Sequence, residues 1–352
     1  MIDSIQFKTF VNKRASTFRI ASGSSDVEDN VIVKIVSGDM FGVGNANPTN
    51  VTHETRQSIE AFLASAQKKL VGTDENDPDK LHTRLDAVAD GNTAAKAAID
   101  IALFDLLSKR EKKPLYAYLG GERTRMLTDM TIGIESKEVT VQKALKHYKA
   151  GFRALKIKVG LDLQEDVRRV AAVRDTVGPK VELRVDANQG YTVEQAIKFC
   201  EEMKTLDVVF VEQPVKAEDL TGLKRVTCES DVPIMADECV KSVLDARKVA
   251  RGGIADMVNI KLMKSAGIND AVMINKFAEA ANMCTMIGCM GEIQLSIAAG
   301  LHFALSSENV KYADLDSHFN IVDDPTSGLR FDSGYLEAPK GPGVGIATPL
   351  DD

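Results

Sequence analysis

The sequence has no tryptophan and no apolar run that approaches the roughly 20 residues needed to cross a membrane. Its first residues, MIDSIQFKTF, lack the apolar core of a signal peptide. The five cysteines show no C-x-x-C spacing, and the five histidines form no zinc-binding pattern. We therefore expect no membrane partner, no zinc site, and reduced thiols in a cytoplasmic protein.

Basic residues are in slight deficit, with 44 Lys and Arg against 51 Asp and Glu, so the formal net charge is −7. This balance suits solubility and argues against a nucleic-acid partner or an anionic membrane surface. The apolar share of 44% is ordinary and argues against extended disorder. A chain of 352 residues exceeds one small core, which leaves one large barrel or sandwich, or two domains.

The first third of the chain has an α+β pattern. Residues 18–20 and 31–36 have strand character, and residues 52–70 and 93–109 have helical periodicity. The polar, acidic stretch Ala21–Asn30 shows no periodicity, and we expect it to form a surface loop or lid.

From about Leu127 onward, short apolar runs alternate with amphipathic helical stretches. The runs are 128–134, 154–159, 181–185, 208–211, 233–236, 257–260 and 284–287. Repeats of this length imply right-handed βαβ units and a parallel sheet. Seven or eight such units fit a closed (β/α) barrel better than a doubly wound sheet.

A charged side chain ends each of five successive predicted strands, namely Lys158, Asp186, Glu212, Asp237 and Lys261. Successive members lie 28, 26, 25 and 24 residues apart, which is about one strand–helix unit each time. In a barrel, such residues converge on the C-terminal rim, where catalytic groups lie. The pattern therefore predicts an active site at that rim.

The three carboxylates in this set predict a metal site. A single acidic residue after a strand is more often a helix cap or a solvated loop residue, but three at unit spacing reverse that expectation. Three converging anions need a cation to stay ionised together. Oxygen ligands without a nearby histidine favour Mg²⁺. We therefore predict that Asp186, Glu212 and Asp237 bind Mg²⁺.

The lysines predict acid–base chemistry. Lys156 and Lys158 are two residues apart, so they share one face of their strand. A surface pair is the alternative, but the flanking residues are apolar, and a buried lysine beside another lysine and a metal has a lowered pKa. Lys261 lies four strands later, across the barrel mouth from Lys158. Two such bases flanking one carbon are suited to 1,1-proton transfer.

Two later motifs are ambiguous on their own. Asp314-Leu-Asp316 places two carboxylates on a last strand, where they suit a substrate ammonium, although an acidic loop is equally consistent. Gly288-Cys-Met-Gly291 ends the seventh strand, where its glycines allow a ligand close to the backbone or form a plain turn.

Together the motifs resemble the enolase superfamily, and within it the dipeptide epimerases of the muconate-cycloisomerase-like subgroup. The resemblance covers nearly the whole chain and rests on Lys156-Ile-Lys158, Asp186-Ala-Asn188, Val211-Glu-Gln-Pro214, Ala236-Asp-Glu238, Asn259-Ile-Lys261, Ile287–Glu292 and the late D-x-D. It implies a (β/α)7β TIM-like barrel with an N-terminal α+β capping domain. The implied domains are a cap with a specificity loop over 1–120, the barrel over 121–320, and a segment over 321–352 that packs back on the cap.

The resemblance also implies a role for each site residue. Lys158 and Lys261 would be the two acid–base catalysts beside Mg²⁺ on the three carboxylates. The substrate, a small dipeptide, would be bound by the remaining residues. Lys156 would hold its carboxylate, Asp314 and Asp316 its N-terminal ammonium, and Thr131 with the backbone near Cys289 and Gly291 would line it.

The sequence departs from the family pattern in ways that bear on the substrate. Asn45 stands where relatives carry a glutamate, and Ile293 where they often carry serine or threonine, but neither removes a catalytic group. Some relatives use an arginine of the first-domain loop to hold a glutamate side chain, whereas Ala21–Asp29 contains no arginine and three acidic residues. We therefore expect the second residue of the dipeptide to be neutral, hydrophobic or cationic. Arg19 borders this loop and would serve glutamate if it pointed inward.

Other functions stay open at this point. An o-succinylbenzoate synthase, a cycloisomerase or an N-acylamino-acid racemase would share the metal ligands and lysines, but the D-x-D motif favours a free ammonium. A barrel kept only as a metal-binding structural protein would have lost a base or a ligand, and none is missing here. Barrels of this kind often associate, so a homo-oligomer is compatible with the resemblance.

Overall fold

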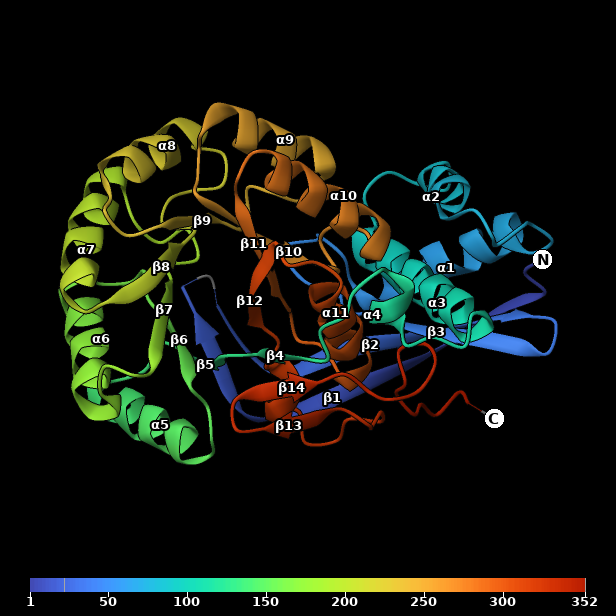
Figure 1. The fold of residues 1–352 in the computed structure, drawn as a ribbon, viewed down its shortest axis with the longest axis horizontal. Helices are drawn as coiled ribbons and strands as arrows, with labels where there is room; N and C mark the ends of the chain where they lie inside the picture. Colours follow the sequence, from blue (N-terminus) through green and yellow to red (C-terminus); the bar gives the residue numbers. More distant parts are fainter. Residues whose placement is uncertain (22, 352) are drawn as a thin grey trace.

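The strand–helix repeats of the sequence close into a barrel in the computed structural model, which describes residues 1–21 and 23–351 (Figure 1). Its eight parallel strands are β5 (Met130–Ile132), β6 (Ala154–Lys158), β7 (Glu182–Asp186), β8 (Val208–Glu212), β9 (Ile234–Ala236), β10 (Met257–Lys261), β11 (Cys284–Gly288) and β12 (Val310–Asp314). The strands lie side by side in chain order from β5 to β12. The predicted barrel is confirmed.

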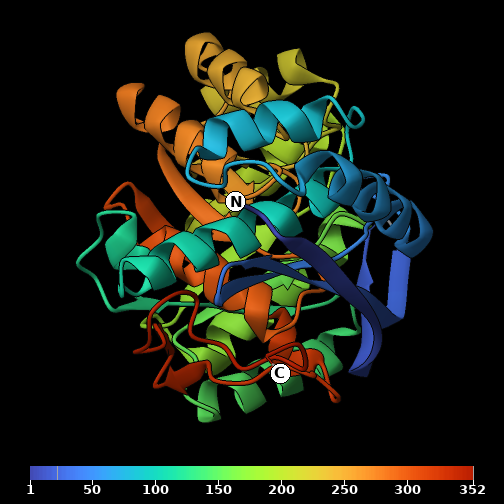
Figure 2. The ribbon, with the colours of Figure 1, turned by 90° about the vertical axis from the view of Figure 1, so that its right-hand side faces the viewer.

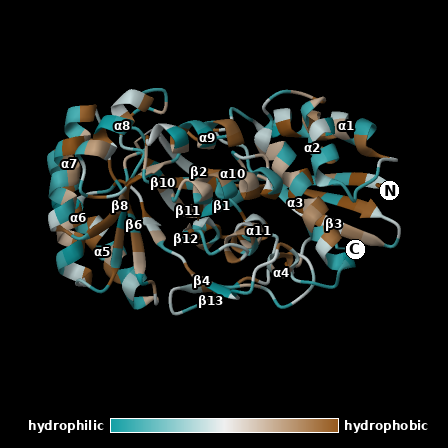
Figure 3. Cartoon of the chain, turned by 45° about the horizontal axis from the view of Figure 1, so that its top comes forward, coloured by the Kyte–Doolittle hydropathy of each residue, from teal (hydrophilic) through white to brown (hydrophobic). Residues whose placement is uncertain are grey.

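One helix follows each of the first seven strands and covers the outside of the barrel. These helices are α5 (Lys137–Lys149), α6 (Leu163–Val177), α7 (Val193–Thr205), α8 (Leu220–Glu229), α9 (Val243–Gly252), α10 (Ile268–Ala280) and α11 (Gln294–Leu305). Hydrophilic and hydrophobic residues alternate along the outer helices (Figure 3), because one face packs on the strands and the other meets water. The order is therefore (β/α)7β.

A short contact closes the ring between the first and last strands. Thr128 forms an isolated parallel bridge with Ala313, and the backbone N–H of Asp129 donates to the Ala313 carbonyl at 3.3 Å. The strands need no alternation of polar residues, since both of their faces are buried. All five residues of β6 and of β10 are buried, including their lysines. Charged side chains inside such strands point to a function, because burying them without partners is costly.

The N-terminal part is a three-stranded antiparallel sheet covered by helices (Figure 2). Its elements are β1 (Ser4–Ile20), β2 (Gly23–Ser37), β3 (Met40–Ala46), α1 (Arg56–Leu70), α2 (Pro78–Asp86), α3 (Thr93–Arg110) and α4 (Leu115–Tyr118). Helix α3 is buried from Ala94 to Ser108, between this sheet and the barrel helix α10. Gly42 and Gly44 allow this packing, because a Cβ there would lie 2.0–2.1 Å from carbonyl oxygens of α3.

The acidic stretch Ala21–Asn30 is not the loop that we predicted. Gly23–Asn30 forms the first part of β2 and pairs with β1 in a long hairpin, while Ser22 lies outside the described residues. The prediction was wrong because this ribbon has no continuous apolar face to give a period of two; its order comes from cross-strand pairing with β1. In Figure 1 the hairpin extends from the cap to the edge of the barrel at β5, where the Ile134 N–H donates to the Arg19 carbonyl at 2.9 Å.

The end of the chain contacts both parts. Strands β13 (Arg330–Asp332) and β14 (Tyr335–Glu337) form a small antiparallel sheet with β4 (Arg125–Leu127), next to the barrel. Farther on, Gly343 bridges Pro114, and the Lys34 ammonium donates to the Leu350 carbonyl. The domain limits given above stay predictions. Among the described residues, none of the helices combines the length and the hydropathy that a bilayer crossing requires.

Candidate active site

The three predicted metal ligands meet at the C-terminal rim of the barrel. Asp186 and Glu212 are the last residues of β7 and β8, and Asp237 directly follows β9. One oxygen atom from each carboxylate lies within 4.8 Å of the others, and all three residues are buried. The β7–β8 register places Asp186 beside Glu212, so the sheet itself sets this geometry.

Lysines flank this cluster on opposite sides. Lys158, at the end of β6, lies with its Nζ 2.6 Å from Asp186 Oδ2. Lys261, at the end of β10, lies with its Nζ 2.8 Å from Asp237 Oδ2. The two lysines thus approach the carboxylates from strands four places apart in the barrel. The structure brings together all five residues that the spacing singled out.

Lys156 lies deeper than Lys158 and is fully buried. Its Nζ is 2.7 Å from Glu212 Oε2, 2.7 Å from Asp314 Oδ2 and 3.1 Å from Asp186 Oδ2. Its ammonium therefore joins the candidate metal ligands to the D-x-D motif. The predicted contact between Lys156 and a substrate carboxylate stays a prediction.

The carboxylates at the rim raise the pKa values of Lys156 and Lys261, whereas we expected lowered values. Burial alone would lower the pKa of Lys261, but Asp237 and Glu212 outweigh it and raise that pKa. The same balance, with Asp314 as the strongest anion, raises the pKa of Lys156 well above its ordinary value. Our expectation invoked a nearby cation, whereas carboxylates dominate the surroundings of these lysines in the protein alone.

The carboxylates themselves divide into two kinds. Burial raises the pKa of Glu212 to about 7, helped by the negative charge of Asp186. For Asp186 and Asp237 burial acts in the same sense, but the neighbouring lysines outweigh it and lower both pKa values. An all-oxygen, buried cluster in which one carboxylate resists ionisation fits a hard divalent cation, whose charge would favour the ionised form. Asp186, Glu212 and Asp237 could hold Mg²⁺.

Three residues that we did not assign a role contact the same carboxylates. The Asn188 backbone N–H donates to Asp186 Oδ1 at 2.9 Å, and Asn259 Nδ2 donates to Glu212 Oε1 at 2.7 Å. Lys264 Nζ lies 2.6 Å from both Asp237 Oδ1 and the Asp237 carbonyl. The first two occur in the motifs quoted above, but only the folded turn after β10 brings Lys264 back to Asp237.

The D-x-D motif forms a second acidic cluster beside Thr131 and Cys289. Asp314 ends β12, while Asp316 lies just beyond it rather than on the strand. The Thr131 N–H donates to Asp316 Oδ2 at 2.6 Å, and the Thr131 hydroxyl donates to Asp314 Oδ1 at 3.3 Å. Ligand atoms of Cys289, Asp314 and Asp316 lie within 4.8 Å of one another. Burial and Asp314 raise the pKa of Asp316 to about 6, so a cation here would be stabilised.

Gly288, the last residue of β11, and Gly291, just beyond it, fit tightly against protein atoms. A Cβ at Gly288 would lie 2.7 Å from Asn259 Oδ1, and a Cβ at Gly291 would lie 2.0 Å from Glu28 Oε2. These glycines therefore leave room for neighbouring side chains of the site and of the hairpin. Contact of the Gly291 backbone with substrate stays a prediction.

The hairpin brings an ion pair to this edge of the barrel. Arg14 Nε donates to Glu28 Oε1 at 2.9 Å, and both side chains are largely buried. Asn47 links this ion pair to the barrel, since its Nδ2 donates to Glu28 Oε2 at 3.5 Å and its Oδ1 accepts from the Gly291 N–H at 2.9 Å. Sequence reasoning missed Arg14 because it lies on β1, outside the acidic stretch. Arg19 is exposed, and no ion pair involves it within residues 1–21 and 23–351.

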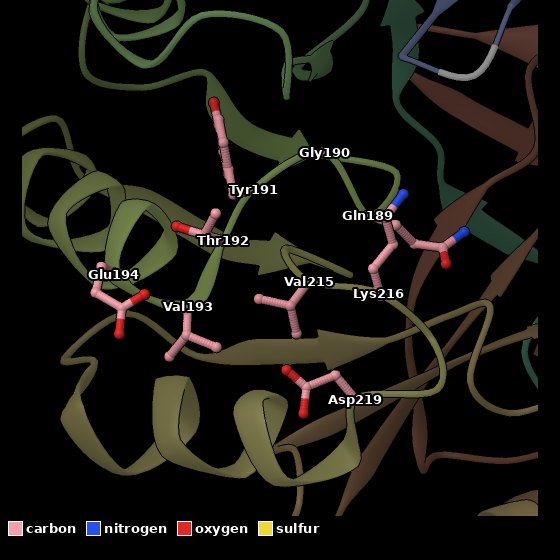
Figure 4. A pocket seen from close by; sticks show the side chains of 9 residues that line it. All are labelled: Gln189, Gly190, Tyr191, Thr192, Val193, Glu194, Val215, Lys216 and Asp219. Atoms are coloured by element: carbon pink, nitrogen blue, oxygen red, sulfur yellow. The ribbon is translucent and has the colours of Figure 1, made fainter.

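A separate cavity of about 430 Å³ lies beside the rim (Figure 4). It is lined by residues that follow β7 and β8, including Gln189, Tyr191 and Lys216. None of the predicted metal, lysine or D-x-D residues lines it. This cavity is therefore distinct from the charged cluster at the barrel mouth.

Two family models match this chain. Residues 4–120 match the N-terminal domain of mandelate racemase and muconate lactonizing enzyme. Residues 140–351 match the enolase C-terminal domain-like family. The two matches span the cap and the barrel described above.

Characterised relatives are similar over nearly their whole length. The chain is 38% identical to a hydrophobic dipeptide epimerase of Enterococcus faecalis, over 95% of this chain and 96% of that protein. It is 39% identical to an L-Ala-D/L-Glu epimerase of Clostridium acetobutylicum, over 94% of each. The crystal structure of an E. faecalis dipeptide epimerase with Mg and L-Leu-L-Tyr superimposes with a TM-score of 0.96 at 37% identity, covering 98% of this chain and 99% of that chain.

Proposed function

The chain belongs to the enolase superfamily and is a Mg²⁺-dependent dipeptide epimerase, and we propose that Lys158 and Lys261 are its two acid–base catalysts. The observation that carries the assignment is the placement of these lysines on opposite sides of one buried carboxylate cluster. A stereocentre held between them can lose a proton to one face and gain a proton on the other.

Each residue then has a defined task. One lysine takes the α-proton of the C-terminal residue, and the other delivers a proton to the opposite face, so the configuration inverts without net change in composition. Asp186, Glu212 and Asp237 would hold Mg²⁺, which when bound would supply positive charge to stabilise the anion formed by proton loss. Reversal of direction exchanges the roles of the two lysines, which is why an epimerase needs both.

The D-x-D cluster supports recognition of a free N-terminus. Asp314 and Asp316 present carboxylates beside Thr131 and the Cys289 thiol. We propose that the N-terminal ammonium of the dipeptide binds here. Its positive charge would stabilise the ionised form of Asp316, whose pKa is raised by burial and by Asp314. Asp314 is already paired with Lys156, whereas Asp316 accepts hydrogen bonds from the neutral Thr131 N–H and Cys289 thiol. An acyl or aryl group would bring no positive charge to Asp316, which disfavours the related racemase, synthase and cycloisomerase activities.

The hairpin supports a second residue that is neutral, hydrophobic or cationic. The nearby arginine, Arg14, is already paired with Glu28, so it offers no free charge to a substrate carboxylate. Asp26 is exposed and accepts a hydrogen bond from the Thr17 hydroxyl. A glutamate side chain would meet acidic groups there, and Arg14 is not free to balance them. Arg19 has no ion pair within the described residues, but its side chain is exposed, and it would serve glutamate only by turning inward.

We also propose a cytoplasmic location, because the five cysteines form no disulfide among the described residues.

The test is mass spectrometry of dipeptide pools incubated with enzyme and MgCl₂ in D₂O. We expect one deuterium at the α-carbon of the C-terminal residue, dependent on Mg²⁺ and on Lys158. The Lys158→Ala variant should lose epimerisation by at least about 10²-fold. Lys198→Ala is the matched control, since Lys198 is exposed on α7, one of the helices that cover the outside of the barrel.

The labelled peptides would identify the preferred second residue. Exchange concentrated in dipeptides that end in neutral, hydrophobic or basic residues would support the proposed specificity. If Ala-Glu had by far the highest kcat/KM, the specificity proposal would be wrong while the epimerase assignment stood. Absence of exchange in every pool, from folded protein that binds Mg²⁺, would contradict the catalytic assignment.

A further inference from the structure

The two oxygen atoms of each candidate metal ligand have different partners. Asp186 Oδ2, Glu212 Oε2 and Asp237 Oδ2 all contact a lysine ammonium, at 2.6, 2.7 and 2.8 Å. The other oxygen of each carboxylate is held by Asn188, Asn259 or Lys264. The same division therefore occurs in all three ligands.

The second set of contacts fixes the rotation of each carboxylate. A carboxylate whose one oxygen is tied to a donor cannot exchange its two oxygens without losing that hydrogen bond. Outer contacts of this kind orient metal ligands in proteins, and their loss weakens metal binding. Asn188 contributes through its backbone, and Asn259 through a neutral amide. Lys264 is the charged member of this set.

The Lys264 ammonium forms both of its hydrogen bonds within the described residues with one residue, Asp237. Its side chain is 1% exposed, and both of its acceptors within the described chain, Oδ1 and the backbone carbonyl, belong to Asp237. A tight turn after β10 presents it, with the Lys264 N–H donating to the Lys261 carbonyl at 3.0 Å. One short segment thus supplies Lys261 to one oxygen of Asp237 and Lys264 to the other.

We propose that Lys264 is a positioning residue that holds Asp237 in the orientation needed to bind Mg²⁺. It does so through two hydrogen bonds at fixed positions, which clamp the carboxylate against its own backbone. It leaves Oδ2 to face Lys261 and the other two ligands. This inference rests on the proposed function, since it concerns the same metal site.

The experiment compares Mg²⁺ binding in variants of Lys264, measured by titration calorimetry of MgCl₂ into protein freed of metal with EDTA. Lys264→Met keeps the length of the side chain but donates nothing, and we expect its Kd for Mg²⁺ to rise by about 10- to 100-fold. Lys264→Gln keeps a donor without the charge, and its Kd should lie between those of wild type and Lys264→Met.

Lys96→Met is the matched control. Lys96 is also buried, but its ammonium pairs with Asp86 in the cap, at 2.7 Å. We expect this variant to bind Mg²⁺ as wild type does. Thermal unfolding of every variant separates loss of the fold from loss of the metal site.

The opposite order of affinities would overturn the proposal. If Lys264 acted only as a positive charge, both variants would bind Mg²⁺ as tightly as wild type or more tightly. Should Lys264→Met fail to fold, an unchanged Kd in Lys264→Gln would have the same meaning. A wild type that binds Mg²⁺ without epimerising dipeptides would contradict the proposed function but not this comparison.

Discussion

Replacement of Lys156 by methionine should destabilise the metal-free protein strongly. The Lys156 ammonium is 0% exposed and lies between Asp186, Glu212 and Asp314. Methionine fills a similar volume without charge, so the change removes the cation and leaves three clustered anions. Water cannot replace the lost ammonium as the partner of these carboxylates, because all three are buried.

The size of the effect follows from the distances. At 2.7–3.1 Å and an effective dielectric constant of about 20, each contact is worth roughly 5–6 kcal/mol of gross attraction. Desolvation offsets most of this sum, and breaking a buried pair typically costs about 3–5 kcal/mol net. We expect about 4–5 kcal/mol here, because three acceptors lose one donor. For a chain of 352 residues this corresponds to a fall in Tm of about 6 °C.

Differential scanning calorimetry with and without MgCl₂ tests this reasoning. Mg²⁺ at about 100 times its Kd should stabilise wild type by about 2.7 kcal/mol. Its effect on Lys156→Met should be larger, since the added cation meets carboxylates that lack their ammonium. Lys96→Met serves as the control for loss of a buried lysine. Equal Tm values for wild type and Lys156→Met without Mg²⁺, or an equal Mg²⁺ shift in both, would refute the argument.

Two further predictions concern the hairpin and acid stability. Glu28→Gln should free Arg14 from its ion pair and raise kcat/KM for dipeptides ending in glutamate by about tenfold, as measured by epimerisation assays. An unchanged ratio of kcat/KM between glutamate-ending and neutral dipeptides would contradict this. Burial lowers the pKa of His302 to about 4 and outweighs the hydrogen bond from its Nε2–H to the Val344 carbonyl, which acts in the opposite direction. The neutral ring also accepts a hydrogen bond at Nδ1 from the Tyr116 N–H. The contribution of His302 to the free energy of unfolding should thus be full above pH 6.5 and smaller by about 2 kcal/mol at pH 5. Chemical denaturation of His302→Gln should show a free energy of unfolding that changes less with pH between 7.5 and 5 than that of wild type. Equal pH dependence in the two proteins would count against the prediction.

Much of the barrel could be predicted because its strands are buried on both faces. Runs such as 208–211 and 257–260 contain little but apolar residues, and the charged residue that follows marks the rim. The spacing of these rim residues then brings Lys158, Asp186 and Lys261 together without knowledge of side-chain packing. Local pattern and tertiary position agree here, which is why the candidate site emerged from sequence.

The hairpin and the outer contacts could not be predicted in this way. The stretch 23–30 has no apolar period, so only pairing with β1 shows that it is a strand. Lys264 follows Lys261 by three residues, which by itself indicates nothing, and its link to Asp237 exists only in the folded turn. Arg14 and Glu28 lie 14 residues apart in the sequence but form an ion pair across the hairpin. Such contacts depend on tertiary geometry rather than on local preference.

The hairpin of β1 and β2 separates two demands on the protein. Its root is part of the cap core, where Val31 and Ile35 are fully buried, whereas residues near its tip, such as Arg19 and Ser24, are exposed. The lysines proposed to transfer the proton belong to the barrel, on another part of the chain. Substitutions near the tip therefore carry little cost in stability and none to the acid–base apparatus. On the specificity role proposed for the hairpin, a few changes in this one ribbon would alter which dipeptide is accepted and would leave the proton-transfer chemistry intact.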